Sequence, residues 1–304
     1  MRATVAQLRR CTPFFAAARA VVGTVALALA ACQAASGTRS MPRLDPTAAI
    51  APKVTDAQCP VGRRVVWHGS FDSQNWLASW DPRAAFDYGE RNTEVVSDSQ
   101  FVRVLRVHYP AGSSSSSYAR EGHPIGGAEF KVSLPKTGSA SSIFLSYWLR
   151  FDSSFQWVLG GKLPGVCGGR CPTGGALVTG EGGWSVRTMW RPSGAGELYA
   201  YILPARAWGT ELGLGAWTFA TGQWHRMAEE LILNTDGQDN GRSRVWYDAE
   251  PTSAPTFEAT NLAFRRDSTG PTTLLFSTFF GGHDVSWATP VDTFIDFARF
   301  VVCQ

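Results

Sequence analysis

The sequence lacks an apolar run long enough to cross a lipid bilayer as a helix. The apolar run Val21–Ala31 falls short of the roughly 20 residues that a spanning helix needs. The segment before this run contains no Asp or Glu but four arginines: Arg2, Arg9, Arg10 and Arg19. A basic stretch followed by a short apolar stretch is typical of a secretory signal. We therefore expect residues 1–31 to be an export signal that is not part of the fold.

The apolar run ends in Leu29-Ala30-Ala31-Cys32, which resembles a bacterial lipobox. In that motif the cysteine becomes the lipidated first residue of the mature protein. We expect lipidation of Cys32 because it lies where the apolar stretch ends. Cleavage near Ala35 or Ser36 is the alternative. The protein is thus expected to be exported, either as a bacterial cell-envelope lipoprotein or in secreted form.

The sequence also lacks an excess of positive charge once this signal is set aside. The full chain has 28 Lys and Arg against 25 Asp and Glu, with a pI of about 8.6. Residues 1–31 hold four of the basic residues and none of the acidic ones, which leaves 24 against 25, a net charge of −1. No field that attracts nucleic acid is expected. An anionic substrate must then be held by a local basic cluster.

The mature chain divides into a tether and one domain. Residues 32–58 are rich in Ala, Pro, Ser and Thr and show no periodicity, so we expect a flexible tether. Residues 59–304 have a length that suits a single all-β domain.

Four cysteines remain after Cys11 leaves with the signal and Cys32 is assigned to the lipid. Four cysteines allow three pairings. We favour Cys59–Cys303, which would join the two ends of the domain, and Cys167–Cys171, which would close a Gly-rich loop. A zinc site is the weaker alternative, because the sequence lacks paired CxxC motifs and its five histidines are scattered.

Segments with strand character dominate the domain. Most are rich in β-branched and aromatic residues and are bounded by Gly, Pro, Asn or Asp. They comprise residues 93–98, 101–109, 127–134, 142–151, 184–190, 197–203, 244–249 and 273–280. Residues 224–233 have a helical alternative, but strands on both sides favour a strand. Many short strands with Gly-rich turns predict an all-β fold, a jelly-roll β-sandwich of two antiparallel sheets.

Three stretches carry polar side chains that could meet. Lys162 lies in a Gly- and Pro-containing segment that we expect to be a loop. On a strand over 184–190, Ser185 and Arg187 share one face, while Trp184, Val186, Thr188 and Trp190 form a core-like face. Tyr199 and Tyr201 share one face of the next strand. If the two strands form a hairpin, Arg187 and the tyrosines are cross-strand neighbours.

This set suits β-elimination from a 4-linked uronate. The C6 carboxylate must be neutralised, a base must remove the C5 proton, and an acid must protonate the leaving oxygen. Arg187 offers a planar fork for the carboxylate. A tyrosine near cations can act as base or acid, and Lys162 can stabilise charge or help to ionise a tyrosine. Taken alone, the spacing favours a structural sheet face with an exposed arginine and two packing tyrosines.

Four motifs in fixed order resemble polysaccharide lyase family 14, the alginate-lyase type, which is also similar in fold to glucuronan lyases. They are GGKLPG (160–165), GGWSVRTMWR (182–191), ELYAYI (197–202) and FSTFFGGHD (276–284). The resemblance implies a β-jelly roll that degrades polyuronates. It also implies that Lys162 is the essential lysine, with Ser185 and Arg187 as the Ser-x-Arg pair and Tyr199 and Tyr201 as the Tyr-x-Tyr pair. The CGGRC insert (167–171) departs from the family pattern and leaves substrate choice open.

One further segment is a candidate for substrate binding. Gly281-Gly282 would let the backbone approach a ligand closely, and the adjacent His283 is a candidate sugar contact or proton-transfer group. Hydrolase chemistry is poorly supported, because there is no GxSxG elbow. The adjacent Glu229 and Glu230 would point to opposite faces of a strand, so they do not form a carboxylate pair for glycoside hydrolysis.

The expected function is a polysaccharide lyase that cleaves alginate, especially mannuronate-rich alginate, or polyglucuronate. Its partner is an acidic polysaccharide, with no nucleic acid, membrane contact only through a lipid anchor, and a monomeric state. No cofactor or metal is required, since Arg187 and Lys162 can neutralise the carboxylate, although calcium dependence stays open. A non-catalytic carbohydrate-binding jelly-roll lipoprotein is the alternative, as is a structural envelope lipoprotein. Lys162 with the tyrosine pair favours the enzyme.

Overall fold

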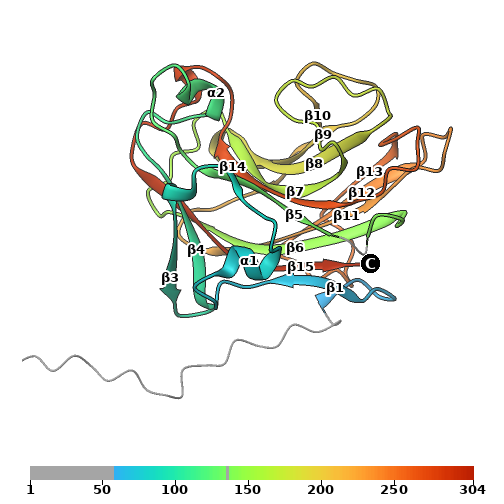
Figure 1. The fold of residues 1–304 in the computed structure, drawn as a ribbon, viewed down its shortest axis with the longest axis horizontal. Helices are drawn as coiled ribbons and strands as arrows, with labels where there is room; N and C mark the ends of the chain where they lie inside the picture. The colour runs from blue at the N-terminus through green and yellow to red at the C-terminus, as the bar shows by residue number, and fades with distance from the viewer. Residues whose placement is uncertain (1–57, 135–136) are drawn as a thin grey trace, which may run out of the picture. The chain divides into compact units, whose positions relative to one another are not determined.

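The computed structural model describes residues 58–134 and 137–304. The expected signal, Cys32 and nearly all of the tether lie outside the described residues. Two antiparallel β-sheets pack face to face (Figure 1), which confirms the predicted all-β jelly-roll sandwich. The α-helices are single turns, α1 (Trp76–Trp80) and α2 (Ser116–Ala119). Within the described part of the chain, no helix is long and apolar enough to cross a membrane.

The first sheet has the strand order β13-β12-β11-β6-β15-β4-β3, and β1 pairs with β15. Its strands are β1 (Val65–Gly69), β3 (Thr93–Asp98), β4 (Val102–Tyr109), β6 (Ser142–Phe151), β11 (Trp224–Ile232), β12 (Gly241–Tyr247), β13 (Phe257–Leu262) and β15 (Thr293–Cys303). The strands predicted at 93–98 and 142–151 coincide with β3 and β6. The ambiguous segment 224–233 is the strand β11.

The second sheet has the strand order β10-β9-β8-β7-β14-β5-β2. Its strands are β2 (Phe86–Tyr88), β5 (Ala128–Ser133), β7 (Gly161–Gly169), β8 (Gly183–Trp190), β9 (Ala195–Tyr201), β10 (Thr210–Thr218) and β14 (Thr273–Phe280). This sheet is strongly curved, and its concave face is turned away from the first sheet (Figure 1). Its convex face packs on the first sheet and forms the core.

The expectation of a loop around Lys162 was wrong, because this segment is the central strand β7. It pairs with β8 on one side and β14 on the other. Leu163 and Pro164 are skipped in both registers, which leaves a bulge where the missing N–H of proline removes no ladder hydrogen bond. Pairing on both sides overrides the local Gly and Pro signal, and Lys162 therefore sits on a firmly held strand.

Alternation along β8 divides its side chains as predicted. Trp184, Val186 and Trp190 belong to the main hydrophobic core between the sheets. Ser185, Arg187 and Met189 therefore point to the concave side of the second sheet.

Residues 58–134 and 137–304 contain two disulfides, and they are the pairings favoured from the sequence. Cys59–Cys303 joins the start of the domain to the end of β15, with Cα atoms 5.8 Å apart. Cys167–Cys171 closes a short turn at the end of β7, with Cα atoms 5.1 Å apart.

Candidate active site

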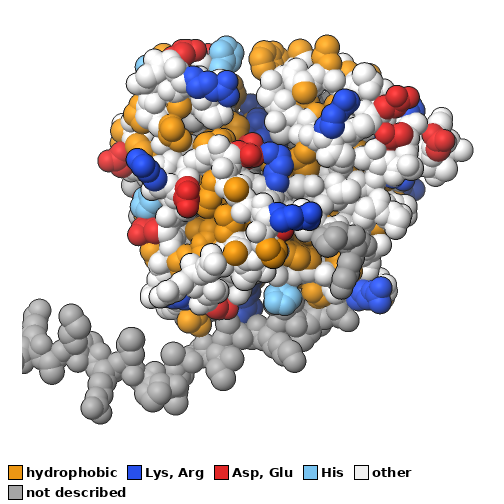
Figure 2. Space-filling view, viewed as in Figure 1, with side chains coloured by type: hydrophobic (Ala, Val, Ile, Leu, Met, Phe, Trp, Pro, Cys, Tyr) orange, Lys and Arg blue, Asp and Glu red, His pale blue; other side chains and the backbone are white. Residues whose placement is uncertain are grey.

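A groove runs over the concave face of the second sheet. Figure 2 shows it between the part of the molecule that carries α2 and the part that carries β9 and β10, with Lys or Arg side chains inside it. The floor is formed by β7, β8 and β9, which are neighbours in the sheet. These strands carry all five polar residues singled out in the sequence.

Strand register brings these five residues together. Arg187 pairs with Tyr199, and Ser185 pairs with Tyr201, so β8 and β9 form the predicted hairpin. On the other side of β8, Lys162 of β7 pairs with Met189. The cluster therefore spans three adjacent strands and needs no contribution from a distant part of the fold.

Lys162 lies against a phenol ring and a thioether. Its Nζ is 3.8 Å from the centre of the Tyr199 ring, and it donates a hydrogen bond to Met189 Sδ at 2.7 Å. Burial lowers the pKa of Lys162 well below its ordinary value, and the nearby charges of Arg187 and Arg191 lower it further. The neutral amine is therefore much more accessible than in an exposed lysine.

The two tyrosines of β9 have different surroundings. Burial raises the pKa of Tyr199 above its ordinary value, and the neighbouring Tyr201 contributes in the same direction. Tyr199 is thus a protonated phenol at neutral pH. The Tyr201 hydroxyl accepts a hydrogen bond from the backbone N–H of Gly175 at 2.9 Å, so it is held by the segment that follows the Cys167–Cys171 disulfide.

Arg187 is a buried cation with unused donor capacity. Arg187 is only 1% exposed. One guanidinium nitrogen, Nη1, donates to Ser277 Oγ at 3.1 Å, and Ser277 donates in turn to Glu129 Oε2 at 2.6 Å. Nε is buried without a hydrogen-bond partner in the described part of the chain. Burial lowers the pKa of Arg187, while Glu129 opposes this effect. An arginine still keeps its proton, and an unpaired buried donor of this kind favours an anion.

Tyr88 of β2 is a neighbour that the sequence did not reveal. Its hydroxyl is buried and has no hydrogen-bond partner among the described residues. Burial and the charge of Glu129 raise the pKa of Tyr88 well above its ordinary value, while Arg187 is close enough to oppose the shift. Two unpaired donors, Arg187 Nε and the Tyr88 hydroxyl, therefore belong to one buried polar cluster.

Ser185 and Tyr201 lie at a covered end of the floor. Ser185 is 0% exposed, and its hydroxyl donates to the Pro172 carbonyl at 2.6 Å. Val178 packs in one cluster with Met189, Tyr199 and Tyr201. The segment 171–182 therefore folds over part of the concave face that carries Ser185 and Arg187, an arrangement that strand periodicity does not encode.

His283 is exposed in the segment that follows β14. Its ring faces the indole of Trp208, with ring centroids 6.0 Å apart and planes inclined by 12°. A side chain at Gly281 or Gly282 would meet the Trp287 ring, at 3.3 Å and 2.2 Å respectively. The close approach that this glycine pair permits in the structure is therefore to Trp287.

Five residues in or beside the site were not predicted from the sequence: Tyr88, Glu129, Arg206, Trp208 and Ser277. Trp208 and Arg206 lie in a segment without periodicity, and Tyr88 belongs to a strand of three residues. Of these five residues, only Ser277 could have been predicted as part of the site, because it lies in the FSTFFGGHD motif. Within residues 58–134 and 137–304, no group of three or more His, Cys, Asp or Glu is arranged to hold a metal ion.

Comparison with known families gives a match over most of the domain. A family model described as Polysaccharide lyase 14 matches residues 97–300. The chain belongs to polysaccharide lyase family 14. It is therefore an enzyme, a polysaccharide lyase, and the non-catalytic alternatives are set aside. Among curated protein sequences, none matches the chain.

Solved structures share the fold of this family 14 lyase. A marine family 14 alginate lyase from Aplysia kurodai is 29% identical, with a TM-score of 0.68, and the match covers 78% of this chain and 98% of that protein. An alginate lyase from a Chlorella virus is 19% identical, with a TM-score of 0.65 and coverage of 79% and 100%. An endo-β-1,4-glucuronan lyase from the fungus Trichoderma reesei is 13% identical, with a TM-score of 0.51 and coverage of 78% and 94%.

Proposed function

We propose that this family 14 lyase cleaves a polyuronate by β-elimination, with alginate as the first substrate and polyglucuronate as the second. The observation that carries the proposal is the contact of Lys162 with the Tyr199 ring beside the buried Arg187. The Aplysia kurodai alginate lyase, at 29% identity, supports alginate. The glucuronan lyase shares the fold, which keeps polyglucuronate as the second candidate.

Arg187 is the proposed receiver of the C6 carboxylate. Its Nε and the Tyr88 hydroxyl are donors without partners in the described part of the chain. Hydrogen bonds from both donors would stabilise the negative charge of the carboxylate strongly, because the site has a low dielectric constant. This stabilisation makes the neighbouring C5–H more acidic.

Lys162 is the proposed base. Its lowered pKa makes the neutral amine more available than in an exposed lysine. The amine takes the C5 proton, the electron pair of the C5–H bond forms the C4–C5 double bond, and the C4–O bond breaks. The Lys162 ammonium then shares the site with the carboxylate of the product.

Tyr199 is the proposed acid. Because its pKa is raised, it keeps a proton that it can donate to the departing glycosidic oxygen. Lys162 Nζ stands over its ring, so the proton gained by Lys162 can afterwards restore the phenol. Acid and base are then both returned to their starting states.

The remaining predicted residues have supporting roles in this proposal. The Tyr201 ring lies edge-on to Tyr199 at 5.8 Å, and Ser185 and Tyr201 hold the segment 171–182 against the floor. His283 contacts sugar in the groove, and Gly281 and Gly282, which pack against Trp287, precede it in the same segment.

We also propose that the protein is exported and anchored by lipid at Cys32, with plain secretion as the alternative. Two disulfides support export, because disulfides persist in oxidising compartments.

The decisive experiment is incubation of the purified protein with mannuronate-rich alginate, guluronate-rich alginate and polyglucuronate. Elimination creates a C4–C5 double bond conjugated with the carboxylate, so ultraviolet absorbance should rise with mannuronate-rich alginate. The variant Lys162→Ala serves as the blank. A protein that is folded yet raises absorbance on no polymer in the panel would contradict the proposed substrate class.

A further inference from the structure

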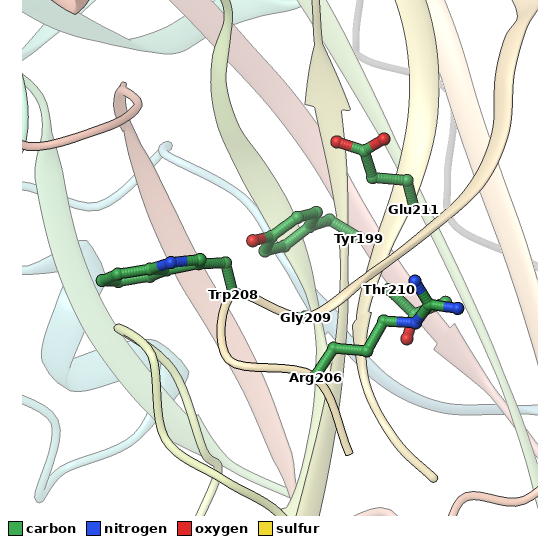
Figure 3. Close-up of a pocket in the computed structure, with 6 residues that line it drawn as sticks. All are labelled: Tyr199, Arg206, Trp208, Gly209, Thr210 and Glu211. Atoms are coloured by element: carbon green, nitrogen blue, oxygen red, sulfur yellow. The ribbon is translucent and has the colours of Figure 1, made fainter. Parts of the chain in front are cut away.

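A separate cavity adjoins Tyr199 on the β10 side of the groove. It has a volume of about 270 Å³ and is lined by Tyr199, Arg206, Trp208, Gly209, Thr210 and Glu211. Figure 3 shows the Trp208 indole at one end of this group and the Arg206 side chain near Thr210 at the other, with the Tyr199 ring between them. The cavity therefore begins at a residue of the catalytic floor and extends away from it.

Trp208 is a large apolar side chain held in an exposed position. It is 64% exposed. Its ring is nevertheless confined, because a Cβ atom on Gly175 would lie 2.9 Å from Trp208 Cζ3, and His283 faces it on another side. A flat, fixed and exposed aromatic ring suits the apolar face of a pyranose ring.

The cation of the cavity is without a partner. Arg206 is exposed and forms no ion pair or side-chain hydrogen bond with the described residues. Thr210 pairs with Ala200 of the core, so its buried hydroxyl points away from the face that carries Tyr199 and Glu211. Arg206 is therefore the polar side chain that can receive an anion in this cavity.

The one carboxylate of the cavity is already engaged. Glu211 forms a short hydrogen bond and ion pair with Arg191. Its charge is therefore offset from outside the cavity, which leaves the Arg206 charge available to an anion.

We propose that Trp208 and Arg206 form a second uronate subsite, which binds the sugar adjacent to the one that reacts. Trp208 stacks on the pyranose ring, and Arg206 binds its carboxylate. The inference rests on the proposed function, because it requires that the groove holds a polyuronate. The subsite would select for a charged sugar on one side of the glycosidic bond that breaks.

Steady-state kinetics on mannuronate-rich alginate tests the subsite. Trp208→Ala and Arg206→Gln should each raise KM about tenfold, with a smaller change in kcat, since binding shared by ground state and transition state is lost. Thr210→Val should leave KM within twofold of wild type, because this hydroxyl lies on the core-facing side of β10. The matched controls are Leu214→Ala, at an exposed apolar residue of β10, and Arg91→Gln, at an exposed arginine that does not line this cavity. Both should stay within twofold of wild type.

Binding measurements separate this inference from the proposed function. In the Lys162→Ala background, calorimetric titration with a mannuronate tetrasaccharide should show weaker binding for both added variants. The Arg206→Gln loss should shrink as NaCl is raised from 50 to about 500 mM, whereas the Trp208→Ala loss should persist. If wild type cleaves alginate while both variants keep wild-type KM and affinity, the subsite is wrong and the function stands. If wild type cleaves nothing but both variants bind the tetrasaccharide more weakly, the function fails and the subsite stands.

Discussion

Trp208 and His283 stack across the groove, with ring centroids 6.0 Å apart and planes inclined by 12°. Their segments follow β9 and β14, which are separated in the sheet by β8 and β7. Neighbouring strands lie about 4.8 Å apart, so the ends of β9 and β14 are separated by roughly 14 Å of sheet. The two segments that follow these strands bring the rings together. Lys162 on β7 and Arg187 on β8 therefore belong to strands that lie between the two supports of this ring pair.

Removal of the His283 ring should weaken polymer binding without abolishing chemistry. We expect His283→Ala to lower kcat/KM on alginate about fivefold, because Trp208 loses the ring that confines it. His283→Phe should keep most of the activity, since it restores a flat ring. If His283→Phe loses as much activity as His283→Ala, the imidazole acts through its protons and not through its shape.

Lys162 should be indispensable to turnover. Lys162→Ala should reduce kcat at least a thousandfold while the melting temperature stays near that of wild type. Lys162→Arg should be nearly as inactive, because a guanidinium does not release its proton to become a base. The pH profile of wild-type kcat/KM should rise through a pKa well below the ordinary lysine value, in line with the lowered pKa of Lys162. Near wild-type activity in Lys162→Ala would remove this residue from the mechanism.

The variant Tyr88→Phe tests whether the substrate carboxylate binds beside Tyr88 and Arg187. Loss of a donor that has no other partner among the described residues should lower kcat/KM about tenfold, with little cost in stability. The control Tyr247→Phe removes a hydroxyl from the first sheet, where it bonds to the Thr218 carbonyl and His225, and should leave activity unchanged. Equal kinetics for Tyr88→Phe and wild type would mean that the carboxylate does not bind beside β2.

Glu229 should make the domain less stable as pH rises. It is 2% exposed, and both carboxyl oxygens lack partners in the described part of the chain. Burial raises its pKa from 4.5 to about 8. The unfolded chain therefore releases this proton first, and stability falls between about pH 4.5 and pH 8 by ~1.4 kcal/mol per unit of pH, up to several kcal/mol.

The variant Glu229→Gln should flatten this dependence and raise the melting temperature above pH 6. The adjacent Glu230 is a matched control, because it pairs with Arg63 at 2.5 Å and with Arg244 at 3.3 Å. Glu230→Gln should destabilise the domain at the same pH. Thermal melts from pH 4 to 9 would decide, and a Glu229→Gln variant with the pH dependence of wild type would show that this carboxyl stays ionised.

The proposed lipid anchor predicts a change of cell fraction. In a bacterial expression host, Cys32→Ala should move the protein from the membrane fraction to the soluble exported fraction, with unchanged lyase activity per mole. Wild-type protein found wholly in the soluble fraction would refute the anchor.

The floor of the groove was largely predictable because it is built from neighbouring strands. Alternation in β8 places Trp184 and Arg187 on opposite faces, and a short connection to β9 makes Tyr199 the cross-strand neighbour of Arg187. Local pattern and tertiary structure agree in these two strands. The alternation of side chains along each strand is therefore enough to predict which residues face the groove.

Other parts of the site depend on contacts that no local pattern contains. Lys162 is paired from both sides on a strand whose sequence resembles a turn. Ser185 is covered by residues 171–182, and Trp208 is held by Gly175 and His283 from other segments. Each of these contacts joins parts of the chain whose proximity is set by the sandwich and not by spacing along the sequence.

The Cys59–Cys303 disulfide fixes where the folded domain begins. It packs with Phe144, Ala228, Trp246 and Val301, side chains on the outer face of the first sheet, while the groove lies on the outer face of the second. The start of the domain at Cys59 is therefore held on the side of the sandwich opposite to the groove. Changes at this end of the chain act on the outer face of the first sheet and leave the floor formed by β7, β8 and β9 untouched.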